Sequence, residues 1–266
     1  MLNTIARTGK ILGLFSAERP EWGVTEVATT LALPKSNAYD VLSSLAAIGL
    51  LQRTPENRYR LGWRLLSMGR NLVQGTGFRQ QTTLVVDTIT RHLGVASTLA
   101  TWDGYRIVCV ASATTPVVRL PDIGTGARLP GHSTALGKMI LSHRPWDDVL
   151  EKIEFYGLPK LTADTVSDLD TLHAQLQEAR SAGVAADHGE TYPSICCVAA
   201  PIFDPRGFIV AAVSISCPTN DMDRNGNHYA RTVRAAARRL SAGLVADEVQ
   251  AESDTATADH RHRQAA

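Results

Sequence analysis

The chain has 266 residues, of which 44% are apolar and 20% are charged, and its formal net charge is +1. This length is enough for one large domain or two smaller ones, which excludes a peptide hormone and an isolated DNA-binding arm. No apolar run reaches the roughly 18 residues that a membrane helix needs, and residues 1–20 lack the apolar core of a signal peptide. We therefore expect a globular protein that works in the cytoplasm and does not bind a membrane.

The charges are unevenly distributed along the chain. Residues 1–75 contain nine Lys and Arg against five Asp and Glu, whereas residues 76–250 contain sixteen against eighteen. The basic excess near the N-terminus is typical of a segment that binds DNA. The four cysteines lie in apolar segments without metal-ligand spacing, so we expect reduced core thiols, no metal and no cofactor.

The first 49 residues carry three helical patterns. Apolar positions recur over residues 4–17, and then in a short segment that starts at Thr25 as N-cap and ends before Pro34. A third helix opens at Lys35 or Ser36 and ends at Gly49. Its apolar stripe consists of Ala38, Leu42, Leu45 and Ile48.

Residues 50–61 alternate in two arms around the turn Pro55-Glu56-Asn57, which predicts a β-hairpin. Three helices followed by a hairpin make a winged helix-turn-helix, which we expect over residues 1–64.

The third helix and the hairpin carry the candidate DNA-binding residues. Cationic side chains and helix-start amides hold phosphates, and polar side chains of the third helix reach base edges. The candidates are Lys35, Ser36, Asn37 and Tyr39 on the helix, with Arg58 and Arg60 on the wing. The alternative is a winged helix that contacts only proteins.

Residues 63–93 have helical periodicity interrupted by Gly75-Thr76-Gly77, so a linker helix is expected over residues 65–78. An α+β domain with a mainly antiparallel sheet is predicted over 79–250, and a disordered tail over 251–266. Strands are predicted over 95–101, 106–112, 117–120, 183–187, 195–203 and 208–216, and helices over 135–141, 146–153, 169–182 and 221–249.

Several runs together resemble the IclR family of bacterial transcriptional regulators. Residues 33–39 (LPKSNAY) and 59–62 (YRLG) are similar to its DNA-binding domain. Residues 126–138 (GARLPGHSTALGK) and 197–204 (CVAAPIFD) are similar to its two effector-domain signatures, and 211–216 (AAVSIS) to its last strand. The resemblance runs from about residue 4 to residue 248 and covers two domains in the family's order.

One departure concerns the third helix, where the family commonly carries Arg and this chain has Asp40. A carboxylate repels phosphate, so the operator sequence cannot be transferred from relatives. Alternatively, Asp40 pairs with Lys35 or with a wing arginine.

The resemblance implies a GAF-like sensor domain whose small-molecule pocket falls on Ala135, Leu136, Asp187, Cys197, Ser214 and Ser216. From the residues themselves, the glycine-rich stretch before Ala135 ends at a helix start that can receive an anion, which favours a carboxylate effector. The alternative is that Asp187 is a solvated turn residue and the serines are satisfied strand hydroxyls. Further wall candidates, or else core residues, are Trp102, Tyr105, Phe155, Tyr156 and Tyr192.

A hydrolase is not expected, because residues 131–135 (GHSTA) lack the second glycine of a nucleophile elbow. His132 and Ser133 are better read as helix-capping residues. The expected protein is a homodimer or tetramer that binds double-stranded operator DNA and senses a small organic acid, with repression and activation both open. A small-molecule sensor or protein-contact module without specific DNA binding is the alternative.

Overall fold

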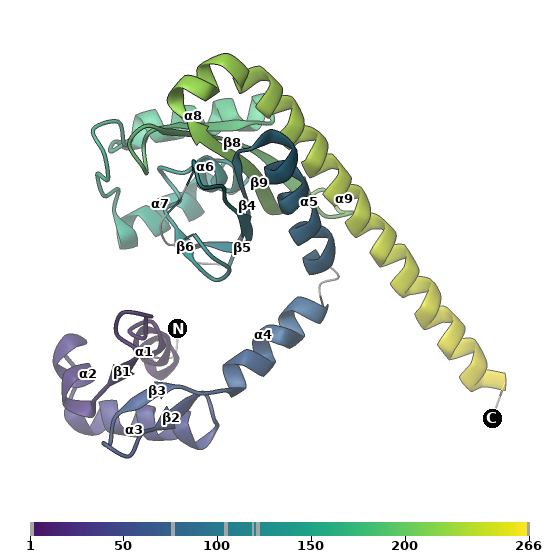
Figure 1. Ribbon diagram of the computed structural model, residues 1–266. Coiled ribbons are helices and arrows are strands. Elements are labelled where there is room, and N and C mark those ends of the chain that lie inside the picture. The colour runs from purple at the N-terminus through teal and green to yellow at the C-terminus, as the bar shows by residue number, and fades with distance from the viewer. Residues whose placement is uncertain (1–2, 76–77, 104–105, 119, 121–122, 265–266) are drawn as a thin grey trace. The chain divides into compact units, whose positions relative to one another are not determined.

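The computed structural model describes residues 3–75, 78–103, 106–118, 120 and 123–264 (Figure 1). The chain divides into two compact units, Met1–Thr76 and Gly77–Ala266, which we describe separately. The helix expected as a linker over residues 65–78 therefore groups mainly with the first unit, while Thr76 and Gly77 lie outside the described residues. None of the described helices combines the length and apolar character that crossing a membrane requires.

The first unit is a winged helix-turn-helix, as predicted. Its three-stranded antiparallel sheet has the order β1-β3-β2, and β1 was not anticipated because it has only two residues. The elements are α1 (Asn3–Leu12), β1 (Glu21–Trp22), α2 (Val24–Thr30), α3 (Lys35–Ala47), β2 (Leu51–Arg53), β3 (Tyr59–Leu61) and α4 (Arg64–Gly75).

Two details of the helices differ from the sequence-based expectation. The N-cap of α2 is Gly23 rather than Thr25. The Glu26 side chain accepts the Gly23 N–H at 2.7 Å, so the helix begins two residues earlier than predicted. The predicted stripe of α3 is buried at its first three positions, but Ile48 follows the helix as its C-cap and is 50% exposed.

The second unit is an α+β structure around a six-stranded antiparallel sheet of order β6-β5-β4-β9-β8-β7. Its strands are β4 (Ala96–Trp102), β5 (Ile107–Ala113), β6 (Arg128–Leu129), β7 (Ala185–His188), β8 (Ile195–Phe203) and β9 (Ile209–Pro218). Its helices are α5 (Phe78–Leu93), α6 (Ala135–Leu141), α7 (Trp146–Tyr156), α8 (Leu169–Ala182) and α9 (Thr219–Gln264).

Helices cover both faces of this sheet. On one face, α5 packs on β4 and β5 while α9 packs on β8 and β9, around a core that includes Leu99, Val213 and Ile215 (Figure 1). On the other face lies the short helix α6, which contacts β4, β8 and β9 and is backed by α8. The alternation of strand side chains therefore separates a large apolar core from a second layer under α6.

Two expectations for this unit are wrong. The segment 117–120 is no strand at its described residues, because Val118 and Leu120 instead bury their side chains against Ala96 and Ile123 from a loop. Arg119 lies outside the described residues. The chain after Ala251 is helical as far as Gln264, as a continuation of α9, rather than lacking regular structure.

Candidate functional site

The start of α3 presents a polar surface. Lys35 and Ser36 are exposed, Tyr39 is 46% exposed, and Asn37 is partly buried. The N-cap is Pro34, whose side chain accepts no hydrogen bond from the helix start, so the first amides of α3 keep their capacity to bind an anion. A sharp turn with Ala32 at φ +51°, closed by Leu33 N–H donating to the Ala28 carbonyl, holds α2 against α3.

The two predicted wing cations differ in their surroundings. Arg60 is exposed and donates to the side-chain oxygen of Gln52, at 3.2 and 3.3 Å. Arg58 is partly buried and donates to the Glu26 carboxylate at 2.6 Å and to the Glu21 carbonyl at 3.1 Å. Its guanidinium therefore ties the wing to α2.

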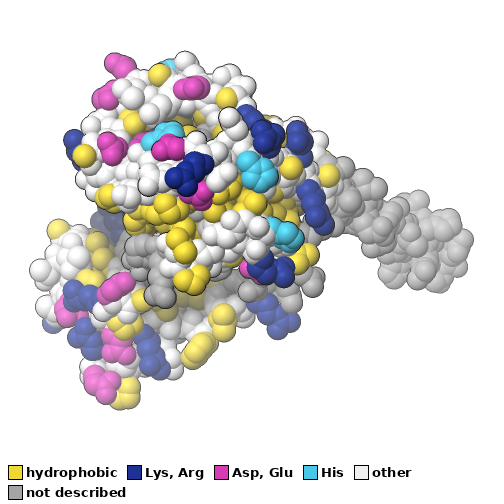
Figure 2. Space-filling view, turned by 45° about the horizontal axis from the view of Figure 1, so that its top comes forward, with side chains coloured by type: hydrophobic (Ala, Val, Ile, Leu, Met, Phe, Trp, Pro, Cys, Tyr) yellow, Lys and Arg dark blue, Asp and Glu magenta, His cyan; other side chains and the backbone are white. Residues whose placement is uncertain are grey.

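Acidic and basic side chains both lie around α3 and the wing. The hydrogen bond from Gly23 N–H, together with the neighbouring Arg58 and Arg19, lowers the pKa of Glu26 below its usual value. Figure 2 shows Lys and Arg side chains next to Asp and Glu side chains over the first unit. Arg53, on β2, is a further exposed wing cation that was not among the candidates.

Asp40 is exposed on α3, where Ser43 donates to its backbone carbonyl at 3.1 Å. Within the described part of the chain its carboxylate forms no ion pair with Lys35, Arg58 or Arg60. The explanation of Asp40 as a partner of these cations is therefore wrong, and the carboxylate lies free on the surface of α3.

In the second unit, the predicted effector residues meet in one layer between α6 and the sheet. Register places Asp187 of β7 beside Cys197 of β8, and Cys197 beside Ser216 of β9. Ser214 lies two residues from Ser216 on the same face. Ala135 and Leu136, at the start of α6, pack on the alanines of this face, which include Ala185, Ala199 and Ala212.

All but one of these six residues are buried, the partly buried Cys197 being the exception. Asp187 is only 2% exposed, so the description of it as a solvated turn residue is wrong. Cys197 Sγ lies 3.1 Å from Ser216 Oγ, and Ser214 Oγ lies 3.4 Å from the Thr98 carbonyl. The layer thus contains polar groups inside an otherwise apolar interior.

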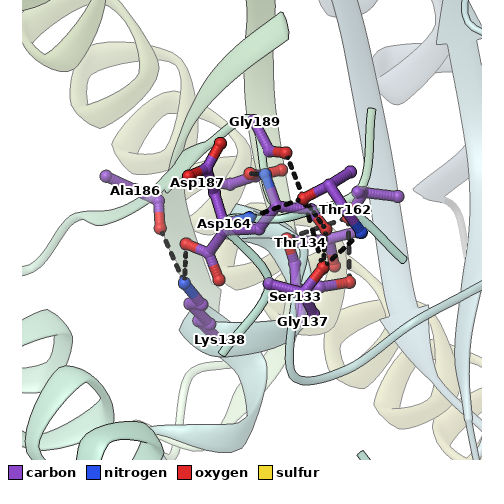
Figure 3. Close-up of polar contacts among 12 residues, drawn as sticks. Ser133, Thr134, Gly137, Lys138, Thr162, Asp164, Ala186, Asp187 and Gly189 are labelled. Carbon is purple, nitrogen blue, oxygen red and sulfur yellow. Dashed lines mark hydrogen bonds and ion pairs between the residues drawn. The ribbon is translucent and has the colours of Figure 1, made fainter. Parts of the chain in front are cut away.

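Asp187 lies next to a buried ion pair that was not expected from the sequence. Its Oδ1 accepts the Glu190 N–H at 2.8 Å, and the Glu190 carboxylate pairs with Lys138 Nζ of α6. Figure 3 shows Lys138 reaching from α6 to the carbonyl of Ala186. Burial raises the pKa of Asp187 to about 7, against the opposing effect of the Glu190 N–H. The sequence feature that could have indicated this ion pair is the lysine inside the apolar run ALGKMIL.

Two polar atoms of this region are buried without a hydrogen-bond partner among the described residues, namely Thr98 Oγ1 and Glu190 Oε2. Thr98 is the register partner of Ser214. A buried acceptor or donor without a partner is costly, so a ligand that bonds to it gains affinity.

The start of α6 is capped by the residue that precedes it. Thr134 is the N-cap and its Oγ1 accepts the Gly137 N–H at 3.0 Å, so the capping role expected for His132 and Ser133 belongs to the next residue. His132 Nε2 donates to the Pro159 carbonyl at 3.0 Å, and Ser133 Oγ lies 2.9 Å from Thr191 Oγ1. Burial lowers the pKa of His132.

The aromatic wall candidates are dispersed. Trp102 packs against the apolar cluster under α6 and, together with Tyr156, lines a cavity of the second unit. Tyr192 packs beside Val118, and Phe155 is 59% exposed. Tyr105 lies outside the described residues.

Comparisons with known proteins match both units. Residues 4–55 match the IclR helix-turn-helix domain, and residues 71–242 match the C-terminal domain of the bacterial transcriptional regulator IclR. The chain is 27% identical over 224 residues to the HTH-type transcriptional regulator XynR of Escherichia coli K12, covering 84% of this chain and 89% of that protein. It is 28% identical over 251 residues to the glycerol operon regulatory protein of Streptomyces coelicolor, covering 92% and 97%.

Solved structures share the fold. A candidate IclR transcriptional regulator from Silicibacter sp. TM1040 superposes with a TM-score of 0.82 at 21% identity, covering 91% of this chain and 96% of that one. An IclR homolog from Microbacterium hydrocarbonoxydans, complexed with 4-hydroxybenzoate, superposes with a TM-score of 0.74 at 24% identity, covering 92% and 100%. With both of its units matched by the models of one family, this chain belongs to the IclR family of bacterial transcriptional regulators.

Proposed function

We propose that this DNA-binding regulator recognises its operator through α3 and the wing, and that a small organic acid held between α6 and the sheet changes operator binding. The contacts to DNA come from Lys35, Ser36, Asn37 and Tyr39 on α3 and from Arg60 on the wing. All of these side chains except the partly buried Asn37 are exposed, and together with the uncapped start of α3 this supports the assignment. The protein acts in the cytoplasm, because operator DNA lies there.

The effector site of the proposal is the layer under α6. The observation that carries it is the polar row Asp187, Cys197 and Ser216 across three neighbouring strands, in which Asp187 and Ser216 are buried. An acid-binding role has a precedent in the Microbacterium homolog, which was crystallised with 4-hydroxybenzoate. A protonated Asp187 can donate a hydrogen bond to a carboxylate, and the serine hydroxyls and Thr98 Oγ1 can do the same.

Operator binding regulates only if the effector prefers one of two states of the protein. A tenfold preference per site corresponds to about 1.4 kcal/mol, so linked sites in a dimer or tetramer sharpen the response. We therefore include a homo-oligomer in the proposal, in which paired winged helices occupy two half-sites.

The test is binding of the full-length protein to the DNA upstream of its own gene, compared with random DNA over a salt series and with a panel of small carboxylic acids. We expect a sequence-specific complex that one acid strengthens or abolishes. Asn37→Ala should weaken operator binding about tenfold while changing random-DNA binding little, because a base contact carries the specificity. Thr4→Ala, an exposed residue on α1, is the matched control.

The effector site is tested on the same complex. Ser214→Ala should remove most of the acid's effect while leaving operator affinity without acid unchanged, since Ser214 belongs to the other unit.

Two results would contradict these assignments. Equal loss of operator and random-DNA binding in Asn37→Ala contradicts the base contact. An unaltered acid response in both Ser214→Ala and Asp187→Ala contradicts the placement of the effector under α6.

A further inference from the structure

Asp40 is the one acidic side chain of α3, whose sequence is KSNAYDVLSSLAA. Ala38 and Leu42, which are buried in the core of the first unit, are each two residues away from it. Two residues correspond to a rotation of about 200° on an α-helix, so Asp40 points away from that core, and it is exposed. The outward face of α3 therefore carries a carboxylate near its middle.

Short side chains surround Asp40 on this face. Ser36 lies one turn before it, and Ser43 and Ser44 lie one turn after it. The Ser43 hydroxyl donates to the backbone carbonyl of Asp40 and not to the carboxylate. Among the residues that the structure describes, no side chain bonds to the carboxylate or pairs with it. It is therefore available to a hydrogen-bond donor from outside the chain.

The place of α3 in the fold brings this face to DNA. It is the second helix of the helix-turn-helix, and the second helix of this motif lies in the major groove. The phosphates repel a carboxylate there, and a carboxylate that loses water without gaining a hydrogen bond costs free energy. Asp40 is thus compatible with tight binding where the DNA supplies a donor to it.

The major groove offers such a donor at two of the four bases. These are the N4 amino group of cytosine and the N6 amino group of adenine, whereas guanine and thymine present acceptors. Adenine also presents its N7 acceptor beside the amino group, and that lone pair repels a carboxylate. Cytosine presents the amino group without such an acceptor of its own, so it is the base that fits Asp40 best.

We infer that Asp40 is a specificity-determining residue, which accepts a hydrogen bond from the N4 amino group of a cytosine in the operator. The inference rests on the proposed function, in which α3 reads base edges, and it assigns a base to a residue outside the contacts proposed there. A carboxylate at this position lowers affinity for DNA in general and so favours the sequence that offers it a donor.

The experiment is selection of binding sites from a pool of randomised DNA duplexes by the full-length protein, followed by fluorescence anisotropy on single-base variants of the enriched site. At one position, the wild type should require cytosine, and replacing that base pair should weaken binding about tenfold. Asp40→Ala should reduce this preference to less than about twofold. Asp40→Asn should change the preference to adenine, because an amide accepts from N6 and donates to N7 together.

A matched variant separates a base contact from a general effect of charge. Glu56→Gln removes an exposed carboxylate of the turn between β2 and β3, and it should keep the preference for cytosine. All three variants should melt at the temperature of the wild type, because Asp40 and Glu56 are both exposed.

Three outcomes overturn the inference. In the first, the wild type enriches a site, but Asp40→Ala and Asp40→Asn keep all of its base preferences, so that Asp40 only repels phosphate. In the second, the position that depends on Asp40 prefers adenine in the wild type, which contradicts the assignment to cytosine. In the third, the wild type enriches no sequence over the pool. This last result alone also overturns the proposed function, because α3 then does not read bases.

Discussion

Cationic side chains of the first unit divide between those that face solvent and those that hold the unit together. Arg58 had been expected to contact DNA, yet its guanidinium is engaged by Glu26 and by the Glu21 carbonyl. Arg60, on β3, is exposed and donates to the neutral side chain of Gln52. We therefore propose that Arg60 contacts a phosphate and that Arg58 positions the wing.

This division predicts different results for two similar substitutions. Arg60→Ala should reduce the slope of log K against log salt by about 1, because one phosphate contact is lost. Arg58→Ala should leave that slope unchanged and lower the melting temperature instead, because Glu26 loses one of the two arginines that pair with it. Salt-dependent fluorescence anisotropy and thermal unfolding measure the two effects. A reduced slope in Arg58→Ala would restore that residue as a DNA contact.

Asp187 makes a pH-dependent contribution to stability. An aspartate in an unfolded chain ionises at about pH 3.9, whereas burial raises the pKa of folded Asp187 to about 7. Between these values the folded protein keeps a proton that the unfolded chain has released, so this group's contribution to the free energy of unfolding falls as the pH rises. Above pH 7 both states are ionised and the contribution is constant.

The measurement is urea unfolding of the wild type and of Asp187→Asn at several pH values between about 4 and 8. Groups that titrate identically in both proteins cancel in the difference. The free energy of unfolding of Asp187→Asn, relative to that of the wild type, should rise by up to about 1.4 kcal/mol per pH unit across this window. Above pH 7 the difference should stay constant. Parallel profiles would show that Asp187 is ionised in the folded protein throughout.

At the scale of elements, an ion pair and a close backbone contact fix the position of α6. Lys138 joins it to the loop after β7, and Gly137 lies against the backbone of Gly131. A Cβ on Gly137 would overlap the Gly131 carbonyl oxygen and lie 2.6 Å from its Cα. These are backbone atoms that cannot rotate away, so only glycine fits at this position.

Gly137→Ala should therefore lower the free energy of unfolding by about 1–3 kcal/mol and weaken effector binding, because the start of α6 must move away from the sheet. Gly226→Ala is the matched control. In α9 the added Cβ meets only the flexible Met222 side chain at 3.4 Å, and alanine favours the helix, so stability should hold or rise. Urea denaturation of both variants tests this, and an unchanged midpoint in Gly137→Ala contradicts it.

At the scale of the whole molecule, α4 carries exposed apolar side chains. Leu65, Met68 and Leu72 lie on one face of this helix, and Met68 and Leu72 are 51% and 70% exposed. Contiguous exposed apolar surface marks an interaction site. In the proposed homo-oligomer, a second copy of the chain covers this face and brings a second winged helix to the operator.

Sedimentation velocity of the full-length protein should accordingly show a dimer or larger species. Met68→Glu/Leu72→Glu should shift it towards monomer and weaken operator binding more than tenfold, because two half-sites can no longer be held together. Ser67→Glu adds one carboxylate at an exposed polar position of α4 outside this apolar face and serves as the control. A monomeric wild type at micromolar concentration would contradict this role of α4.

The sequence by itself determined most elements of this protein and the order of its two domains. The bounds of α6, α8 and β8 coincide with the predicted ranges, because helix and strand periodicities are properties of neighbouring residues. The resemblance to IclR regulators likewise rests on short contiguous runs. The burial of Asp187, by contrast, depends on its sheet neighbours, and no local pattern distinguished it from a turn residue.

Only the tertiary structure decided which side chains meet. Arg58 and Glu26 are 32 residues apart in the chain, and Lys138 and Glu190 are 52 apart, so no spacing rule pairs them. The apolar pattern of 117–120 resembles a strand, but a strand needs a free sheet edge, and these residues pack from a loop instead. Partners and burial are set by the register of distant strands, and that register is a property of the folded chain as a whole.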